Sequence, residues 1–345
     1  MRDVARLAGV SHQTVSRVLN ESAQVSPEAR ERVQRAVEQL GYRRNTAARA
    51  LVTRRSMKLG VVGIGTAQYG PAVALFSIAE YARQRGYSTS LVGLDDIDRR
   101  SMREAIEHLV ADPVDGIVVF APLIAAVAAV EGLTTSVPLV LFEPGGDDGS
   151  TVVAGDEVHG ARLATRHLLS LGHETVCHLS GPAGWLSTDA RSRGWAAELA
   201  AARRAPGQVV VGDWSSASGY DAAKKLLRDR TVSALFVAND QMALGALRAA
   251  AEMGRSVTED LSVVGFDDIP EAAFFTPSLT TIRLDFAELG RRCVQRLLGL
   301  ITSENLSDAL VSPPELAVRR STAAPHWRHS SSGKIPRQQP IRSGR

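Results

Sequence analysis

The spacing of apolar residues divides the chain into a short helical head and a long body in which strands alternate with helices. Short β-branched or apolar runs, each typical of a buried strand, are found at residues 59–64, 88–92, 116–120, 138–142, 175–179, 208–211, 233–238 and 261–266. Amphipathic stretches with helical spacing are found at residues 71–85, 97–111, 156–171, 187–204, 217–229, 240–253 and 285–301. Such alternation predicts βαβ units and mainly parallel sheets. Eight strands are more than we expect in one open sheet, so we expect two packed α/β subdomains.

In the head, the positions of capping residues predict three short helices. A first helix over residues 3–8 ends at Gly9, and Ser11 can cap a second helix that runs to about residue 19. A third helix begins at Ser26-Pro27 and ends at Gly41. Two short helices joined by a tight turn form a helix-turn-helix, whose second helix can enter the major groove of DNA.

The second helix carries polar residues of the types that bind DNA. The candidate contacts on it are Ser11, His12, Gln13, Thr14, Ser16 and Arg17. Gln13 can pair with adenine and Arg17 with guanine, while His12 can reach either a base or a phosphate. The hydroxyl side chains are candidates for phosphate contacts. The alternative is a small helical cap with a solvated polar face.

Charge is distributed unevenly along the chain, although its net value is only +3. Residues 1–58 hold 12 Lys and Arg against 5 Asp and Glu, a net charge of +7. Residues 319–345 hold 7 basic and no acidic residues, so the part between carries −11. The basic head supports a polyanion as its partner. The tail, rich in Pro, Ser, Arg and Gln, is expected to be disordered, and it either adds non-specific DNA affinity or is simply solvated.

Several classes of protein are disfavoured by the sequence. No apolar run reaches the length of about 18 residues that a membrane span needs, and the amino terminus has no secretory signal. Cys177 and Cys293 make no metal spacing, and the sequence Gly63-Ile-Gly65 is followed by Gln68 where a dinucleotide fold requires glycine. There is no Gly-x-Ser-x-Gly elbow. We therefore expect a cytoplasmic protein associated with the nucleoid, with no enzyme activity, cofactor or metal.

The head resembles the DNA-binding domain of the lactose-repressor (LacI) family of bacterial transcription regulators. The resemblance is carried by the residues Asp3-Val4-Ala5, Ala8-Gly9-Val10-Ser11, Gln13 to Asn20, Val25-Ser26, Leu40-Gly41-Tyr42, Asn45, Ala48 and Leu51. It implies that residues 45–53 form a hinge helix that folds on operator DNA, where Asn45, Ala48 and Leu51 contact the duplex. Leu51 would wedge into the minor groove and kink it; the alternative is an ordinary apolar linker residue. The chain begins two residues before Asp3, nearer than in most of the family, so either the first helix frays or the start lies upstream.

The body resembles the effector domain of the same family, which has the type I periplasmic-binding-protein fold, and is close to the member that gives the family its name. Matching segments are residues 171–173, 212–215, 237–245, 262–268 and 279–282. The resemblance implies sugar contacts at Arg191, Trp214, Asn239 and Asp267, with Tyr69, Glu143 and Ser187 also lining the ligand site.

The residue types at these positions suit a sugar. An Arg fork and a carboxylate can each bind adjacent hydroxyls, and an indole face packs on a pyranose ring. Arg191, Asn239 and Asp267 lie near predicted strand ends, where α/β sheets bind ligands. Taken singly, Asp267 can be a turn residue and Trp214 a core aromatic.

Together these patterns predict an all-α helix-turn-helix head with a hinge helix, joined to a two-subdomain α/β effector domain. The predicted boundaries are 1–58 for the head and 59–322 for the effector domain, with its N-subdomain at 59–155 and 285–312, its C-subdomain at 156–284 and 313–322, and the tail at 323–345. Because residues 323–345 contain no Leu, we expect a homodimer rather than a tetramer held by a leucine-rich bundle.

The predicted function is a repressor of sugar-utilisation genes, released from a palindromic operator by a sugar or glycoside, with a galactoside as the leading candidate. The alternatives are a regulator that its ligand tightens on DNA, and a sugar-binding protein without a regulatory role.

Overall fold

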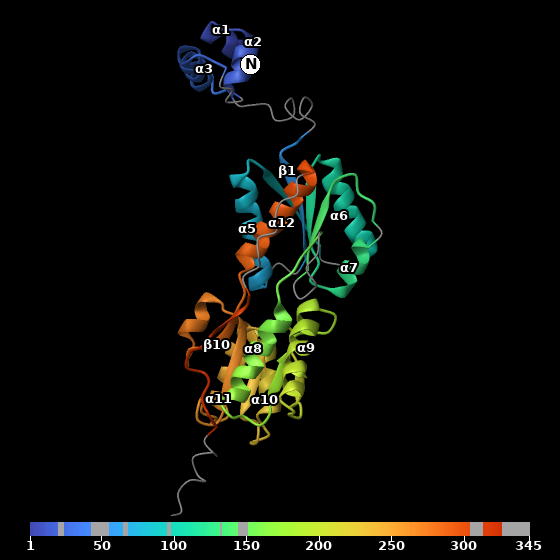
Figure 1. Ribbon diagram of the computed structural model, residues 1–345, viewed down its shortest axis with the longest axis vertical. Coiled ribbons are helices and arrows are strands. Elements are labelled where there is room, and N and C mark those ends of the chain that lie inside the picture. Colours follow the sequence, from blue (N-terminus) through green and yellow to red (C-terminus); the bar gives the residue numbers. More distant parts are fainter. Residues whose placement is uncertain are drawn as a thin grey trace, which may run out of the picture. The chain divides into compact units, whose positions relative to one another are not determined.

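A computed structural model describes residues 1–19, 24–42, 55–64, 68–94, 98–131, 133–143, 151–303 and 313–325 of the chain. Internal contacts divide it into two compact units, Met1–Ser56 and Met57–Arg345 (Figure 1). The predicted hinge helix, with Asn45, Ala48 and Leu51, and the tail beyond residue 325 lie outside the described residues.

The described residues of the first unit form three helices: α1 (Arg2–Ala8), α2 (His12–Leu19) and α3 (Pro27–Gln39). Gly9 ends α1 in the left-handed conformation, with a φ of 62°. The Oγ atoms of Ser11 and Ser26 accept the backbone N–H groups of Thr14 and Ala29, at 3.1 and 3.3 Å. These caps begin α2 and α3 at the residues that the sequence predicts. A small buried core joins the helices; it consists of Val4, Ala5, Ala8, Val15, Val18, Val33 and Ala36.

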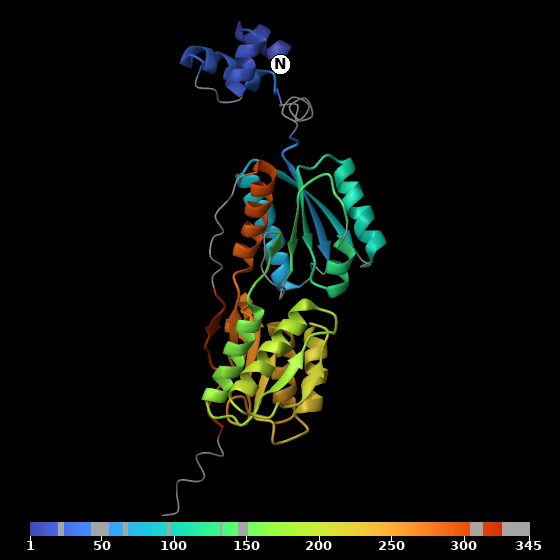
Figure 2. The ribbon, with the colours of Figure 1, turned by 45° about the vertical axis from the view of Figure 1, so that its right-hand side comes forward.

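The amino-terminal lobe of the second unit is a parallel five-stranded sheet with helices on both faces (Figure 2). Its elements are β1 (Lys58–Ile64), α5 (Tyr69–Gln84), β2 (Ser88–Leu94), α6 (Arg99–Ala111), β3 (Gly116–Phe120), α7 (Ile124–Val130), β4 (Leu139–Phe142), β5 (Val152–Val153) and α12 (Phe286–Thr302). The strand order is β2-β1-β3-β4-β5. Helices α5 and α12 pack closely because Gly290 has no side chain: a Cβ there would lie 2.4 Å from the carbonyl oxygen of Ala74.

The carboxy-terminal lobe is a six-stranded sheet of order β11-β10-β9-β8-β6-β7. Its elements are α8 (Glu157–Ser170), β6 (Cys177–Ser180), α9 (Leu186–Ala201), β7 (Val209–Val211), α10 (Ser216–Leu226), β8 (Ala234–Val237), α11 (Asp240–Glu252), β9 (Ser262–Asp267), a 3-10 helix η1 (Pro270–Phe274), β10 (Thr280–Arg283) and β11 (Glu315–Ala317). Every pairing is parallel except that of β11 with β10. None of the helices in the described ranges is long and apolar enough to cross a membrane.

The predicted fold class is confirmed. The elements that the sequence pattern missed are short or have no alternation of apolar and polar residues. Helix α7 reads Ile-Ala-Ala-Val-Ala-Ala-Val, so no polar face reveals its period. Strand β5 has two residues and β11 has three. Strand β10 is four residues long and follows closely on η1. These strands form through pairing with neighbours rather than through their own pattern.

Candidate ligand site and DNA-binding surface

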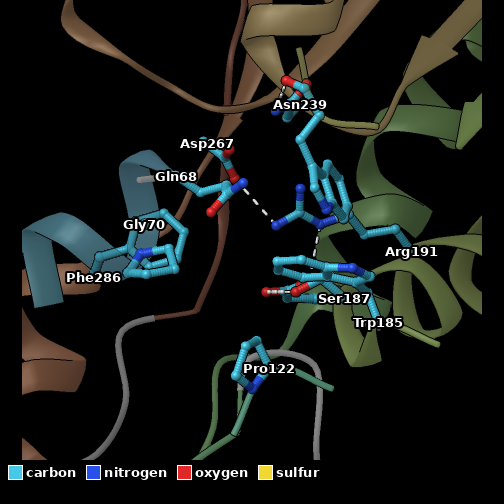
Figure 3. Close-up of a pocket in the computed structure, with 12 residues that line it drawn as sticks. Gln68, Gly70, Pro122, Trp185, Ser187, Arg191, Asn239, Asp267 and Phe286 are labelled. Carbon is cyan, nitrogen blue, oxygen red and sulfur yellow. Dashed lines mark hydrogen bonds and ion pairs between the residues drawn. The ribbon is translucent and has the colours of Figure 1, made fainter. Parts of the chain in front are cut away.

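A pocket lies between the two lobes, and residues of both line it (Figure 3). The amino-terminal lobe contributes Gln68, Gly70, Pro71, Pro122 and Phe286, and the carboxy-terminal lobe contributes Glu157, Trp185, Ser187, Arg191, Trp214, Asn239 and Asp267. Many of these residues follow the carboxyl ends of parallel strands. Pro122 comes two residues after β3, Asn239 two residues after β8, and Asp267 ends β9. Such a crevice is the usual ligand site of open α/β sheets.

Arg191 is the central charge of the pocket. It projects from α9 and is only 4% exposed. Its Nε atom donates to Glu157 Oε2 at 2.9 Å, its Nη2 to Asp267 Oδ1 at 3.1 Å, and its Nη1 to the carbonyl oxygen of Ala238. Three of its five N–H groups are thereby used within the described residues. The other two are available to a ligand.

Asp267 is the second polar group of the pocket. Its backbone φ is 103°, a left-handed conformation that is strained for a residue with a side chain. Burial raises the pKa of Asp267 to about 7; Arg191 opposes this shift, and the nearby charge of Glu157 adds to it. The Oδ2 atom has no hydrogen-bond partner among the described residues. Asp267 can therefore accept a hydroxyl donor from a ligand.

A second buried carboxyl, that of Asp240, lies behind Asp267. Burial, and after it the charge of Asp267, raises the pKa of Asp240 well above its usual range. Asp240 accepts the hydroxyl of Thr281 at 2.6 Å and the backbone N–H of Ile269 at 2.9 Å. These bonds fix the loop that follows β9, and so the position of Asp267.

Trp214 forms a wall of the pocket and is held from three sides. Its carbonyl oxygen accepts the Nδ2 of Asn239 at 3.0 Å, and its backbone has a φ of 74°. The indole lies against Gly181, where a Cβ would come within 2.2 Å of the ring. The guanidinium carbon of Arg191 lies 5.6 Å from the ring centroid. A fixed indole beside a charged fork suits a ring with an apolar face and hydroxyls at its rim.

Only some of the predicted ligand residues line the pocket. Ser187, Arg191, Trp214, Asn239 and Asp267 line the pocket together. Tyr69 and Glu143, which the sequence analysis also predicted as ligand residues, are not among the residues that line it.

Tyr69 instead makes an edge contact with the ring of Phe286, with centroids 6.2 Å apart. Glu143 follows β4, where its backbone N–H donates to Val153. Arg191 reaches the pocket from within α9, not from a strand end as the sequence suggested. Asn239 uses its Oδ1 to cap α11 and its Nδ2 to hold Trp214, so its amide is largely engaged by the protein.

Sequence reasoning missed seven residues of the pocket, of which four have polar or aromatic side chains: Gln68, Glu157, Trp185 and Phe286. Glu157 is 1% exposed and also accepts the Ser187 hydroxyl, at 3.2 Å. Its sequence position, directly after the capping Asp156, resembles the acidic first turn of any helix. Only the packing of α8 against α9 turns it inward.

In the first unit, α2 presents its polar residues outward. Ser11, His12, Gln13 and Arg17 are exposed, Thr14 and Ser16 are half-buried, and the opposite face is buried through Val15 and Val18. The Ser11 hydroxyl accepts the Thr14 backbone N–H and also lies 2.9 Å from the Thr14 hydroxyl. Ser11 is thus a helix cap as well as a candidate phosphate contact.

Comparison with known proteins relates both units to one family. Residues 1–45 match the profile of bacterial regulatory proteins, lacI family, and residues 165–322 match a periplasmic binding protein-like domain. The chain is 36% identical to the lactose operon repressor of Escherichia coli strain K12, over 95% of this chain and 92% of that protein.

Two solved structures extend the comparison. One is the lac repressor dimer bound to operator and the anti-inducer ONPF; its TM-score is 0.82 at 35% identity, over 93% of this chain and 98% of that one. The other is the transcriptional regulator CelR in complex with cellobiose; its TM-score is 0.68 at 31% identity, over 92% and 98% of the two chains.

Proposed function

This chain belongs to the lacI family of bacterial regulatory proteins, and we propose that it is a transcriptional repressor that binds a palindromic operator as a homodimer and leaves it when a sugar or glycoside occupies the pocket between the lobes. It acts in the cytoplasm, on the nucleoid, and has no enzyme activity. The observation that carries the sugar assignment is the pairing of Arg191 with Asp267 beside the fixed indole of Trp214.

The chemistry of the pocket favours a neutral polyol over a charged ligand. Arg191 already has two carboxyl partners, Glu157 and Asp267, so its positive charge is compensated within the protein and an anionic ligand would gain little from it. The two unused N–H groups of Arg191 and the free Oδ2 of Asp267 match the acceptor and donor character of vicinal hydroxyls. A galactoside is the leading candidate, because the similar lactose operon repressor carries a lactose name and the four implied sugar contacts are present.

The head supplies the DNA-binding surface. Gln13 and Arg17 are exposed on α2 and can hydrogen-bond base edges in the major groove. The excess of basic residues over residues 1–58 supports phosphate neutralisation. Asn45, Ala48 and Leu51 contact the minor groove in this proposal.

An exposed apolar surface on the amino-terminal lobe supports the homodimer. Phe76 on α5 is 75% exposed and Leu91 on β2 is 55% exposed. They border a groove with Val61, Leu75 and Ile78. Large apolar side chains left open together mark a surface that another protein covers. A second copy of the chain would bring two heads to the two halves of a palindrome.

The ligand can either weaken or strengthen operator binding, and we propose that it weakens it. In the proposed mechanism, ligand changes the relative orientation of the two lobes and thereby separates the paired hinge segments. The ligand and the operator then weaken each other's binding by the same factor. The second candidate is a ligand that strengthens operator binding.

The proposal is tested by selecting bound duplexes from a random DNA pool with the full chain. We expect a palindromic consensus whose affinity falls steeply with salt, because Lys and Arg contacts release counterions. A control pool with the half-sites shifted by five base pairs should bind far more weakly. Recovery of no consensus, or an affinity that is independent of salt, contradicts the proposal.

A further inference from the structure

The carboxylate of Asp268 lies between two arginines of the carboxy-terminal lobe, and its side chain is only 6% exposed. The Nε atom of Arg283 donates to its Oδ2 atom at 2.7 Å, and the Nη2 atom of Arg319 donates to its Oδ1 atom at 2.6 Å. Hydrogen bonds between ionised groups are the strongest that side chains make. One carboxylate therefore holds two arginines that lie far apart in the sequence.

The two arginines lie on the segments through which the chain passes between the lobes. Arg283 is the last residue of β10, and α12 of the amino-terminal lobe begins three residues later, at Phe286 (Figure 1). Arg319 lies two residues after β11, the strand that the chain forms in the carboxy-terminal lobe after α12. When two lobes change their relative orientation, the segments that connect them must accommodate the movement. Asp268 joins two of these segments.

Arg319 is fixed to β10 as well as to Asp268. Its backbone N–H donates to the Thr280 hydroxyl at 2.9 Å, and its Nη1 atom donates to the carbonyl oxygen of Leu279 at 2.7 Å. Arg283 is 55% exposed, and in the register of the sheet it is paired with Asp267 on β9. The arginines thus connect β10 and β11 to the end of β9, where Asp267 meets the pocket.

Asp268 is tied to the ligand site through its neighbour Asp267. The backbone φ is 103° at Asp267 and 53° at Asp268, so two successive residues are in the left-handed region. This region is small for residues with a side chain, which leaves the turn little freedom to deform. The next backbone N–H, that of Ile269, donates to the buried carboxyl of Asp240 at 2.9 Å. A displacement of Asp267 is therefore carried to Asp268 rather than absorbed between them.

We propose that Asp268 is a positioning residue that couples the pocket to the connections between the lobes. A ligand that contacts Asp267 shifts the carboxylate of Asp268, and the two arginines transmit this shift to β10 and β11. The inference rests on the proposed function, because it assumes that a ligand contacts Asp267 and that the lobes reorient. Asp268 is not among the residues that line the pocket. It therefore sets how strongly ligand and operator affect each other, not how tightly the ligand binds.

The test measures the coupling ratio, which is the dissociation constant of the operator with a saturating sugar divided by the constant without it. The operator is the consensus that the full chain selects, and the sugar is the tightest binder in calorimetry among lactose, cellobiose, methyl β-D-galactopyranoside and methyl β-D-glucopyranoside. Asn also adopts the left-handed conformation, so Asp268→Asn removes the charge and keeps the turn. We expect this variant to bring the ratio at least about fivefold closer to one and to keep its sugar affinity within about threefold of wild type.

Arg283→Gln tests the same ion pair from its exposed partner, and Arg319 still compensates Asp268 in this variant. We expect part of the same fall in the ratio, and no additional fall in the double variant, because Asp268→Asn already removes this pair. Glu198→Gln is the matched control. Glu198 also holds two arginines, Arg162 and Arg166, but its partners lie on α8 and not on a connection between the lobes. Its ratio should equal that of wild type.

Three results overturn the inference. The wild-type ratio in Asp268→Asn, or in Arg283→Gln if the first variant does not fold, would show that the ion pair does not couple the sites. A loss of sugar affinity with an unchanged ratio would show that Asp268 only supports the pocket. Falls that multiply in the double variant would show that the two residues do not act through their contact.

The wild-type chain tests the proposed function separately, before any variant is made. A wild-type ratio of one contradicts the proposed function itself. A ratio below one corrects only the sign that we propose for the coupling, and Asp268→Asn should still bring that ratio towards one.

Discussion

The Nε atom of Arg191 lies 2.9 Å from the Oε2 atom of Glu157, and both side chains are almost completely buried. Glu157 thus sets the orientation of the guanidinium without lying among the predicted ligand contacts. Replacing one partner of a buried ion pair leaves the other charge uncompensated. We expect Glu157→Gln to lower the free energy of unfolding by about 3 kcal/mol and to weaken sugar binding at least about tenfold. Urea unfolding and calorimetry measure the two effects.

Glu198→Gln is the matched control for that variant. Glu198 also pairs with arginines, Arg162 and Arg166, but these are 41% and 52% exposed and lie outside the pocket. We expect a smaller loss of stability than in Glu157→Gln and unchanged sugar affinity, since solvent screens the half-exposed arginine partners of Glu198. A Glu157→Gln protein that binds sugar like wild type would show that Arg191 does not need this partner.

The raised pKa of Asp267 makes stability depend on pH. In the unfolded chain this carboxyl ionises near the ordinary Asp pKa of 3.8, whereas in the folded chain it keeps its proton up to about pH 7. Its contribution to stability is therefore complete below about pH 4 and is lost as the pH rises to 7. Arg191, Glu157 and Asp240 face the same group and are all retained in Asp267→Asn, where the pKa of Asp240 falls because the charge of Asp267 is gone.

We therefore expect the free energy of unfolding of wild type to fall between about pH 4.5 and about pH 7.5, the range over which Asp267 ionises in the folded chain. The free energy of unfolding of Asp267→Asn should fall less over the same range. Urea unfolding at several pH values in this range measures the difference. Parallel pH profiles for the two proteins would contradict the raised pKa.

Gly181 allows Trp214 to occupy its place in the pocket. A Cβ at this position would lie 2.2 Å from the indole and 2.5 Å from the Thr188 hydroxyl, so the ring must move. We expect Gly181→Ala to change the tryptophan fluorescence and to weaken sugar binding at least about tenfold. Gly93→Ala, on β2 with open space around its Cβ position, should leave both unchanged. Unaltered sugar affinity in Gly181→Ala would remove Trp214 from the ligand site.

Gln13 is expected to read one base of the operator. Gln13→Ala should cost about 1–3 kcal/mol on the preferred operator and relax the preference at a single base position. Gln34→Ala is the control, because it removes the same type of side chain from an exposed position on α3 rather than on α2. Electrophoretic mobility shifts on operators changed one base pair at a time measure the effect. A uniform loss on all sequences would instead make Gln13 a phosphate contact.

Phe76 is expected to lie in the homodimer interface. Phe76→Glu places a charge in the apolar groove that a second copy would cover, so the protein should become monomeric. Phe274→Glu changes another exposed phenylalanine, 86% exposed on η1, and should stay dimeric. Light scattering gives the mass of each. A wild-type protein with the mass of one chain, or a Phe76→Glu dimer, would contradict this assignment.

The sequence predicts those parts of the fold in which local pattern and tertiary structure agree. The caps at Ser11 and Ser26 and the alternating strands and helices of the body fall where the pattern places them. The missed residues depend on contacts between distant segments. Trp185 enters the pocket because a bridge to Leu123 holds it there, and Glu157 turns inward because α8 packs on α9. Neither relationship leaves a periodic trace in the sequence.

The central claim is that sugar in the pocket and operator at the head weaken each other's binding. The most direct test is the dissociation constant of a labelled operator, measured by fluorescence anisotropy with and without a saturating sugar that calorimetry shows to bind. We predict that the sugar raises this constant about 5- to 150-fold in wild type and has no effect in Arg191→Ala. An operator affinity that the bound sugar leaves unchanged, or strengthens, would contradict the account.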